Sequence, residues 1–187
     1  MNVLFLSLLY HPDDIQQVAT FSRDGLQNQI NTYQWAFVDG LEQTLHTGES
    51  LSILNSLPVG AYPRHYRRLR LAGKTRQGGA YQEIGSLNLP LLKQRARAKR
   101  AERKIAAWVT ASPENRTILV YSLYLPYMQA VAAIKARFPY VRATVIVTDL
   151  PNELGIASGR QGFAKWLEYR IGDQRTALCK AFDGFVL

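Results

Sequence analysis

Hydrophobic and polar positions follow one another along the chain in blocks that predict alternating strands and helices. The continuous apolar run 2–9 has the pattern of a strand buried on both faces, as in a parallel sheet. A polar loop follows at about 10–25. The apolar residues that then recur at helical spacing, and so predict the buried face of a helix, are Leu26, Ile30, Tyr33, Phe37, Leu41 and Leu45. Residues 51–54 predict the second strand.

The middle of the chain is irregular, and its second half has a clearer rhythm. Proline and glycine punctuate 55–88, where we expect short strands near 66–71 and 80–86, and a helix is expected at about 90–110. The other expected elements are strands at 117–122, 143–148 and 185–187 and helices with apolar faces over 127–138 and 163–182. Strands that alternate with helices predict parallel βαβ units with right-handed crossovers. The expected fold class is α/β, a Rossmann-like open parallel sheet with helices on both faces.

Size and composition fit one domain. The chain has 187 residues, of which 47% are hydrophobic and 11% aromatic, enough for one packed core and too many for disorder. We therefore expect a single Rossmann-like domain over 1–187. Because 185–187 begins a strand in the heart of the sheet, we also expect the natural sequence to be longer. The single cysteine, Cys179, allows no disulfide framework and fits a reducing, cytoplasmic compartment.

The charge balance favours an anionic partner without choosing one. The net charge is +9, and two basic clusters stand out. The run 93–104 on the expected helix is either a patch for an anionic membrane or nucleic acid, or a solvated helix face with long stems over apolar surface. The second cluster, Arg64 to Arg70, is interleaved with Tyr62 and Tyr66, but no known nucleic-acid signature accompanies it, so nucleic acid is not the expected partner.

Most common cofactor motifs are missing from the sequence. Tyr10-His11-Pro12-Asp13 follows the first strand in place of the Gly-x-Gly-x-x-Gly of dinucleotide-binding proteins. Gly73-Lys74-Thr75 lacks the first glycine of a P-loop. The three histidines are far apart and no Asp-x-Asp triplet occurs, so neither a metal site nor a bound cofactor is expected.

Ligands of open parallel sheets bind outside the carboxyl ends of the strands, and the segments expected there carry a resemblance. They are 7–12, 121–127 and 147–153, the last containing Asp149-Leu150-Pro151 after a hydrophobic strand. Together with 25–31 and 57–63, they resemble the N-terminal domain of a family-4 retaining glycosyltransferase with the GT-B architecture. The resemblance covers the whole chain in order.

The resemblance implies a function and a division of labour. Such enzymes have two Rossmann-like domains that face a cleft: the N-terminal domain binds the acceptor, and the C-terminal domain holds the nucleotide-sugar, without a metal. This chain would be the acceptor-binding domain for sugar transfer to a polysaccharide or glycolipid, and inactive alone. Many members have a histidine where this sequence has Thr148, so the catalytic assignment passes to the neighbouring Asp149.

The candidate site residues follow from these segments. Asp149 is expected either to orient or deprotonate an acceptor hydroxyl or to cap the following turn. Gly25 is expected to let the helix-start amides approach the donor diphosphate, or to be a plain turn glycine. The candidates for contact with the acceptor, each of which has an alternative as a surface or packing residue, are Ser7, Tyr10, His11, Ser122, Tyr124, Asn152 and Glu153.

Two functional hypotheses remain at this point. The first is the acceptor-binding domain of a glycosyltransferase, whose basic charge would suit a lipid-linked acceptor and a peripheral position at the inner face of the membrane. The second is a non-catalytic nucleotide- or nucleic-acid-binding module of Rossmann-like fold. Fold alone does not separate them, because this architecture carries many chemistries.

Overall fold

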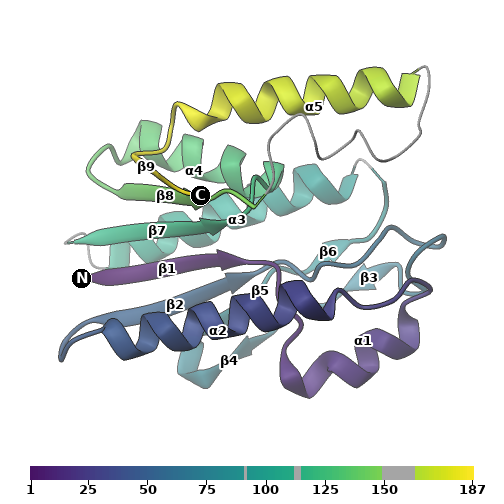
Figure 1. Ribbon diagram of the computed structural model, residues 1–187, viewed down its shortest axis with the longest axis horizontal. Helices are drawn as coiled ribbons and strands as arrows, with labels where there is room; N and C mark the ends of the chain where they lie inside the picture. The colour runs from purple at the N-terminus through teal and green to yellow at the C-terminus, as the bar shows by residue number, and fades with distance from the viewer. Residues whose placement is uncertain (91, 112–114, 149–162) are drawn as a thin grey trace.

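A computed structural model describes residues 1–90, 92–111, 115–148 and 163–187 and confirms the predicted fold class (Figure 1). A seven-stranded sheet has the order β4-β5-β2-β1-β7-β8-β9, in which every pair is parallel except β4 with β5. Its strands are β1 (Asn2–Ser7), β2 (Ser50–Asn55), β4 (Thr75–Arg76), β5 (Tyr81–Glu83), β7 (Arg116–Tyr121), β8 (Arg142–Ile146) and β9 (Gly184–Val186). A two-stranded antiparallel ribbon pairs β3 (Arg70–Leu71) with β6 (Ser86–Leu87).

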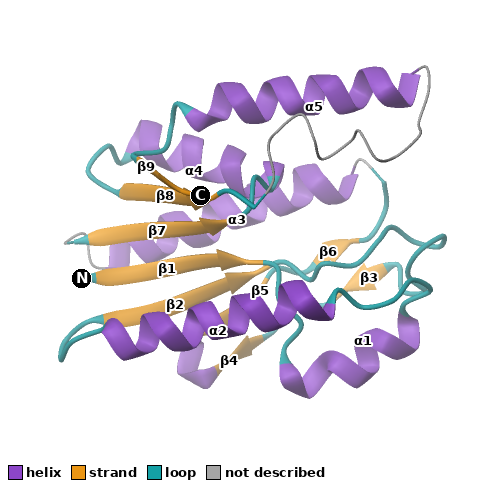
Figure 2. Ribbon diagram, in the orientation of Figure 1, coloured by secondary structure: helices purple, strands orange, loops and turns teal. Residues whose placement is uncertain are grey.

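Helices cover the two faces of the sheet unequally, as Figures 1 and 2 show. The long helix α2 (Asn28–Thr44) lies across β1 and β2 on one face, here called the front. The helices α3 (Leu92–Ala111) and α4 (Leu125–Arg137) pack side by side on the back, and α5 (Phe163–Cys179) packs against α4. No helix in the described residues is long and apolar enough to cross a bilayer.

The back of the sheet holds the larger core. Alternate residues of the central strands, such as Leu4, Leu6, Ile118 and Val120, pack there against α3 and α4. Tyr127 of α4 is fully buried, and its hydroxyl donates to the carbonyls of Ser7 and Leu54 at 3.0 and 2.9 Å. Pro126 stands at the first turn of α4, where a missing N–H costs nothing. This core fixes the carboxyl ends of β1 and β2 relative to α4.

The helix α2 packs differently from the sequence prediction. Its buried residues are Gln34 and Val38, whereas Ile30 and Tyr33, expected on the apolar face, are 39% and 51% exposed. The Gln34 amide explains why a different face of α2 is turned towards the sheet. Its Oε1 accepts from the Leu8 N–H at 2.9 Å, and its Nε2 donates to the Leu8 carbonyl at 2.8 Å. A buried polar side chain is tolerated when it is hydrogen-bonded in this way.

The segment 10–25, predicted as a loop, contains the 3₁₀ turn η1 (Pro12–Asp14) and a short helix α1 (Ile15–Phe21). A third apolar cluster holds α1 in place, because Val18 and Phe21 pack with Tyr66 of the following irregular region. In that region the expected strand 66–71 is reduced to β3, and 80–86 divides into β5 and β6. Tertiary packing, rather than length or periodicity, makes α1 helical.

Candidate ligand-binding edge of the sheet

The strand order changes direction between β1 and β7, which defines where a ligand is expected. From β1 the chain winds outward through β2 to β5, and after α3 it returns to the other side of β1 as β7 (Figure 1). In open α/β sheets such a switch point leaves a crevice outside the carboxyl ends of the two strands. The loops after β1 and β7 therefore hold the first candidates.

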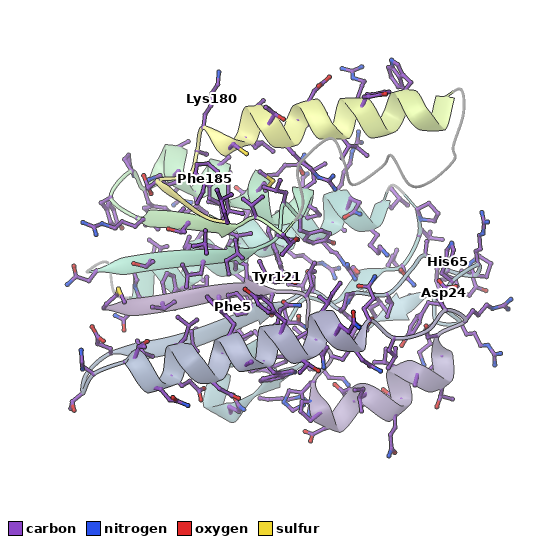
Figure 3. All side chains as sticks on the ribbon, viewed as in Figure 1. Phe5, Asp24, His65, Tyr121, Lys180 and Phe185 are labelled. Carbon is purple, nitrogen blue, oxygen red and sulfur yellow. The ribbon has the colours of Figure 1, made fainter. Side chains whose placement is uncertain are left out.

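A groove of about 360 Å³ opens on this edge, on the β7 side of the switch. It lies between the first turns of α2 and the carboxyl ends of three strands, β7, β8 and β9. Its lining residues are Gln29, Ile30, Tyr33, Tyr121, Ile146, Val147, Thr148, Val186 and Leu187. Figure 3 shows Tyr121 at the end of β7, close to α2.

The groove combines aromatic and aliphatic surface with a few polar groups. The rings of Tyr33 and Tyr121 lie with their centroids 6.1 Å apart and tilted at 44°. Tyr121 is buried, but Tyr33 and Val186 remain 51% and 47% exposed. Gln29 and Thr148 add an amide and a hydroxyl. Apolar walls with a small number of hydrogen-bonding groups are typical of sites for small organic ligands.

Two of the residues predicted at the end of β1 and just after it lie in the interior. Ser7 is fully buried, and its hydroxyl donates to Asn55 Oδ1 at 3.2 Å. Tyr10 is 3% exposed, and its hydroxyl donates to the Pro58 carbonyl at 2.9 Å. Both side chains are used to hold the loops that follow β1 and β2, and their contact with an acceptor stays a prediction.

His11 lies between aromatic rings and beside a group of charges. Its ring makes edge contacts with Trp35 and Tyr81 at centroid distances of 5.9 and 5.0 Å, and Nδ1 accepts from the Asp13 N–H at 3.3 Å. Burial and the nearby Arg76 lower the pKa of His11 below its ordinary value, which favours the neutral imidazole. It serves here as the cap of η1, which is the alternative to substrate contact.

After β7, the two predicted residues are partly accessible. Ser122 is half-buried and has a positive φ of 59°, uncommon for a residue other than glycine. Tyr124 is half-buried, packs edge-on against Tyr127 at 5.2 Å, and its hydroxyl accepts a hydrogen bond from Arg97 at 2.9 Å. The structure therefore joins Tyr124 to a basic side chain that the site prediction did not include.

Three predicted residues, Asp149, Asn152 and Glu153, lie outside the described residues, so their roles stay predictions. Thr148, which directly precedes Asp149 in the sequence, is exposed and lines the groove. Gly25 is exposed, and a Cβ added to it would meet no atom within 4 Å. Its expected approach to a donor diphosphate also stays a prediction.

Sequence reasoning missed a polar network at the ends of β1, β2 and β5. Asn55 is fully buried, accepts from the Leu9 N–H at 2.7 Å, and donates to the Leu9 carbonyl and to Tyr81 Oη at 3.0 and 2.9 Å. Its register partner Glu83 is 5% exposed. Burial, with the nearby Asp14 charge, raises the pKa of Glu83 to about 7 in spite of the attraction of Lys74.

Salt bridges near Glu83 connect separate segments on the β5 side of this edge. Asp14 Oδ1 accepts from Lys74 Nζ at 2.6 Å, and Asp14 Oδ2 accepts from Arg76 Nη2 at 2.7 Å. These contacts join η1 to β4, two segments about sixty residues apart in the chain. The irregular sequence of 55–88 gave no signal for this pairing, because β4 has only two residues.

Sequence reasoning also did not place two cations of the basic run 93–104 in the interior. Lys93 and Arg97 are 9% and 2% exposed, although the run was interpreted as surface. A signal was present: the buried stripe of α3 is Lys93, Arg97, Ala101, Ile105 and Val109, spaced every four residues. Extending the apolar stripe towards the start of the helix would have placed both cations on the inner face.

No protein-family model, curated protein or solved structure matches this chain. The fold and the edge therefore carry the interpretation: a Rossmann-like α/β domain with a groove at the carboxyl ends of its strands. In the described part of the chain, no three His, Cys, Asp or Glu side chains gather as a metal site.

Proposed function

We propose that this chain is the acceptor-binding domain of a GT-B glycosyltransferase, which moves a sugar from a nucleotide-sugar to a polysaccharide or glycolipid acceptor. The observation that carries the proposal is the groove of about 360 Å³ beside the switch point, lined by Tyr33 and Tyr121. Its position agrees with the place where open sheets bind ligands, and its volume falls in the range of small-molecule sites, roughly 300–1,000 Å³.

The chemistry of the groove suits a sugar ring. A pyranose has C–H groups on its faces and hydroxyls around its edge, so it needs an aromatic surface together with scattered hydrogen-bonding groups. The half-exposed ring of Tyr33 supplies the surface, and Gln29 and Thr148 supply an amide and a hydroxyl. Ile30, exposed beside them, extends the apolar wall.

In this proposal Asp149 accepts the hydrogen bond of the acceptor hydroxyl that attacks the sugar. A carboxylate with an ordinary pKa near 3.9 is ionised at pH 7 and can take that proton. Thr148, its neighbour in sequence, lines the groove, which supports a role for the segment that begins there. A second domain with the nucleotide-sugar would face the same edge and complete the site.

The proposed location is the cytoplasmic face of a membrane, with peripheral attachment. Arg95, Lys99, Arg100 and Arg103 of α3 are exposed, and the net charge of +9 favours an anionic surface. We expect cosedimentation with vesicles that contain anionic lipid, weakened by salt because the charges are solvent-exposed. Equal binding to neutral and anionic vesicles would contradict this part of the proposal.

The groove is tested by binding measurements with a matched pair of tyrosine variants. Tyr33 and Tyr140 are 51% and 54% exposed, but Tyr140 precedes β8 and therefore lies at the opposite edge of the sheet. Isothermal titration against a panel of oligosaccharides and glycolipid headgroups should identify a ligand. Tyr33→Ala is expected to weaken its binding at least about tenfold, which is about 1.4 kcal/mol, and Tyr140→Ala to leave it unchanged. Equal affinities of the two variants would refute the groove as the acceptor site.

A further inference from the structure

The beginning of α3 carries two buried positive charges. Lys93 and Arg97 are separated by one helical turn and are 9% and 2% exposed. Among the side chains that the structure describes, no carboxylate forms a salt bridge with either of them. Buried charges in proteins are normally paired or bound to an ion, because an unpaired charge loses its hydration without compensation.

Their hydrogen bonds go to neutral oxygens only. Lys93 Nζ donates to the Val59 carbonyl at 2.7 Å. The Arg97 guanidinium donates to the Leu57 carbonyl at 2.8 Å, to Tyr124 Oη at 2.9 Å and to Ser86 Oγ at 3.4 Å. These bonds use one of the three ammonium N–H groups and three of the five guanidinium N–H groups. Both cations therefore keep N–H groups for a ligand.

The surroundings of Lys93 and Arg97 favour the binding of an anion. The two cations repel each other, and burial together with Arg97 lowers the pKa of Lys93 to about 8. They also stand in the first two turns of a twenty-residue helix, where the backbone N–H groups add positive potential. Glu83, a buried acid with an electrostatic effect on Arg97, has a pKa raised to about 7 and is only partly ionised at neutral pH.

The position of Lys93 and Arg97 fits a ligand site at the edge of the sheet that the carboxyl ends of the strands form, here called the carboxyl edge. α3 begins at this edge, between the loop after β2, which supplies Leu57 and Val59, and Tyr124 at the start of α4 (Figure 1). The pair is not sealed, because Lys93 keeps some exposure and both Pro58 and Tyr124 are only half-buried.

We propose that Lys93 and Arg97 form a binding site for a phosphate group. A phosphate has the charge to neutralise the two cations and enough oxygens to accept hydrogen bonds from their remaining N–H groups. The planar guanidinium of arginine matches the geometry of phosphate oxygens. The phosphate belongs either to a free ion or to a phosphorylated ligand that reaches the switch point. The inference does not depend on sugar transfer, since it concerns only the unbalanced charge.

The experiment uses pyrophosphate as the probe and thermal unfolding as the readout. Pyrophosphate at millimolar concentration should raise the Tm of the chain by several degrees, whereas sodium chloride of equal ionic strength and acetate should not. Lys93→Met should lose at least tenfold in pyrophosphate affinity. Lys99→Met, which removes the same charge from an exposed position on the same helix, should keep it. Tyr33→Ala should also keep it, which separates this site from the groove.

The stability of Lys93→Met without anion gives a second readout. If the ammonium is retained for a ligand, removing it in phosphate-free buffer should leave the Tm unchanged or raise it, because an unbalanced buried charge disappears. A purely structural lysine would give a large loss of Tm and no pyrophosphate response in the wild type, which would overturn the proposal. Equal responses of Lys93→Met and Lys99→Met would also overturn it. Should Lys93→Met not fold, wild-type amide signals decide: pyrophosphate must shift those of Val59, Lys93 and Tyr124.

Discussion

The two halves of the carboxyl edge, on either side of the switch between β1 and β7, use their side chains in opposite ways. On the β2 and β5 side, Asn55, Asp14 and Tyr10 are buried and their polar atoms are bonded to other parts of the scaffold. On the β7 to β9 side, Tyr33 and Val186 are exposed around a groove. The first side, here called the closed half, holds loops together, and the second side, the open half, presents an exposed groove.

This difference separates residues that stabilise the fold from residues that are accessible for binding. Figure 3 illustrates a further contrast: the exposed pair His65 and Asp24, joined at 2.7 Å, lies far from Tyr121 in the view and joins loops only. Strand-end location alone therefore does not identify a site residue. The burial of the side chain and its hydrogen-bond partners must be considered as well.

The largest expected effect is on stability, at Asn55. Asn55→Ala removes a buried amide that bonds Leu9 at both N–H and carbonyl, and it leaves Tyr81 Oη and Ser7 Oγ without this partner. We expect a loss of about 3 kcal/mol in the free energy of unfolding, since each orphaned buried group costs about 1–3 kcal/mol. Urea denaturation measures it. Tyr33→Ala, on the open half, should cost less than about 1 kcal/mol; equal losses would break the comparison.

Glu83 gives the next effect, and it depends on pH. Its folded pKa is about 7, above the ordinary value of 4.5, so the stability it contributes is complete below about pH 4.5 and is lost as the pH rises through 7. Glu83→Gln removes this dependence. At pH 8 the variant should be more stable than the wild type by up to about 3 kcal/mol, and the difference should vanish near pH 4.5. A difference that does not change with pH would contradict the assignment.

The binding effect of the groove should be smaller in energy, about 1.4 kcal/mol or more for Tyr33→Ala. Val186→Ser is a second test, because Val186 is 47% exposed and belongs to a different element of the same groove. We expect it to weaken ligand binding a few-fold and to change the free energy of unfolding by less than about 1 kcal/mol. Titration calorimetry of the ligand found for the wild type checks both values. Unchanged affinity in both variants would leave the open half without a binding role.

The smallest effect is expected at Asp183, ahead of β9. Burial alone would raise its pKa, but the hydrogen bonds from Lys135 Nζ and the Ala143 N–H outweigh this and lower it. The stability from this group is present above the ordinary pKa and is lost as the pH falls through the folded value. Because the carboxylate is 46% exposed, Asp183→Asn should cost less than about 1 kcal/mol at pH 7. Thermal unfolding at pH 7 and pH 3 measures it; an undiminished loss at pH 3 would contradict the ionic explanation.

Much of the fold could be predicted from the sequence, because the buried parallel strands are apolar runs. β1, β7 and β8 follow directly from the runs at 2–9, 117–122 and 143–148. The short helix α1 could not be predicted, because seven residues between polar loops become helical only through contact with Tyr66. The antiparallel strand β4 was also missed, since two residues carry no periodicity.

The candidate site was predicted less completely. The sequence located the strand-end segments, and the structure places Thr148 of the third segment on the groove. It did not show that Ser7 and Tyr10 turn inward, because hydrogen bonds such as that between Ser7 and Asn55 join residues 48 positions apart. The exposure of Ile30 and Tyr33 was not predicted for a related reason. Helical spacing placed them on the core face of α2, but in the structure Gln34 faces the sheet, where its amide bonds the Leu8 backbone.

The most direct test of the central claim is to map ligand contacts on the amide signals of the ¹⁵N-labelled chain. During titration with the oligosaccharide or headgroup found by calorimetry, we predict shifts concentrated at Ile30, Tyr33, Tyr121, Thr148 and Val186. Signals of Asn55 and Tyr81, in the closed half, should move little. Shifts centred on Asn55 and Tyr81, or no shifts with any glycan of the panel, would contradict the account.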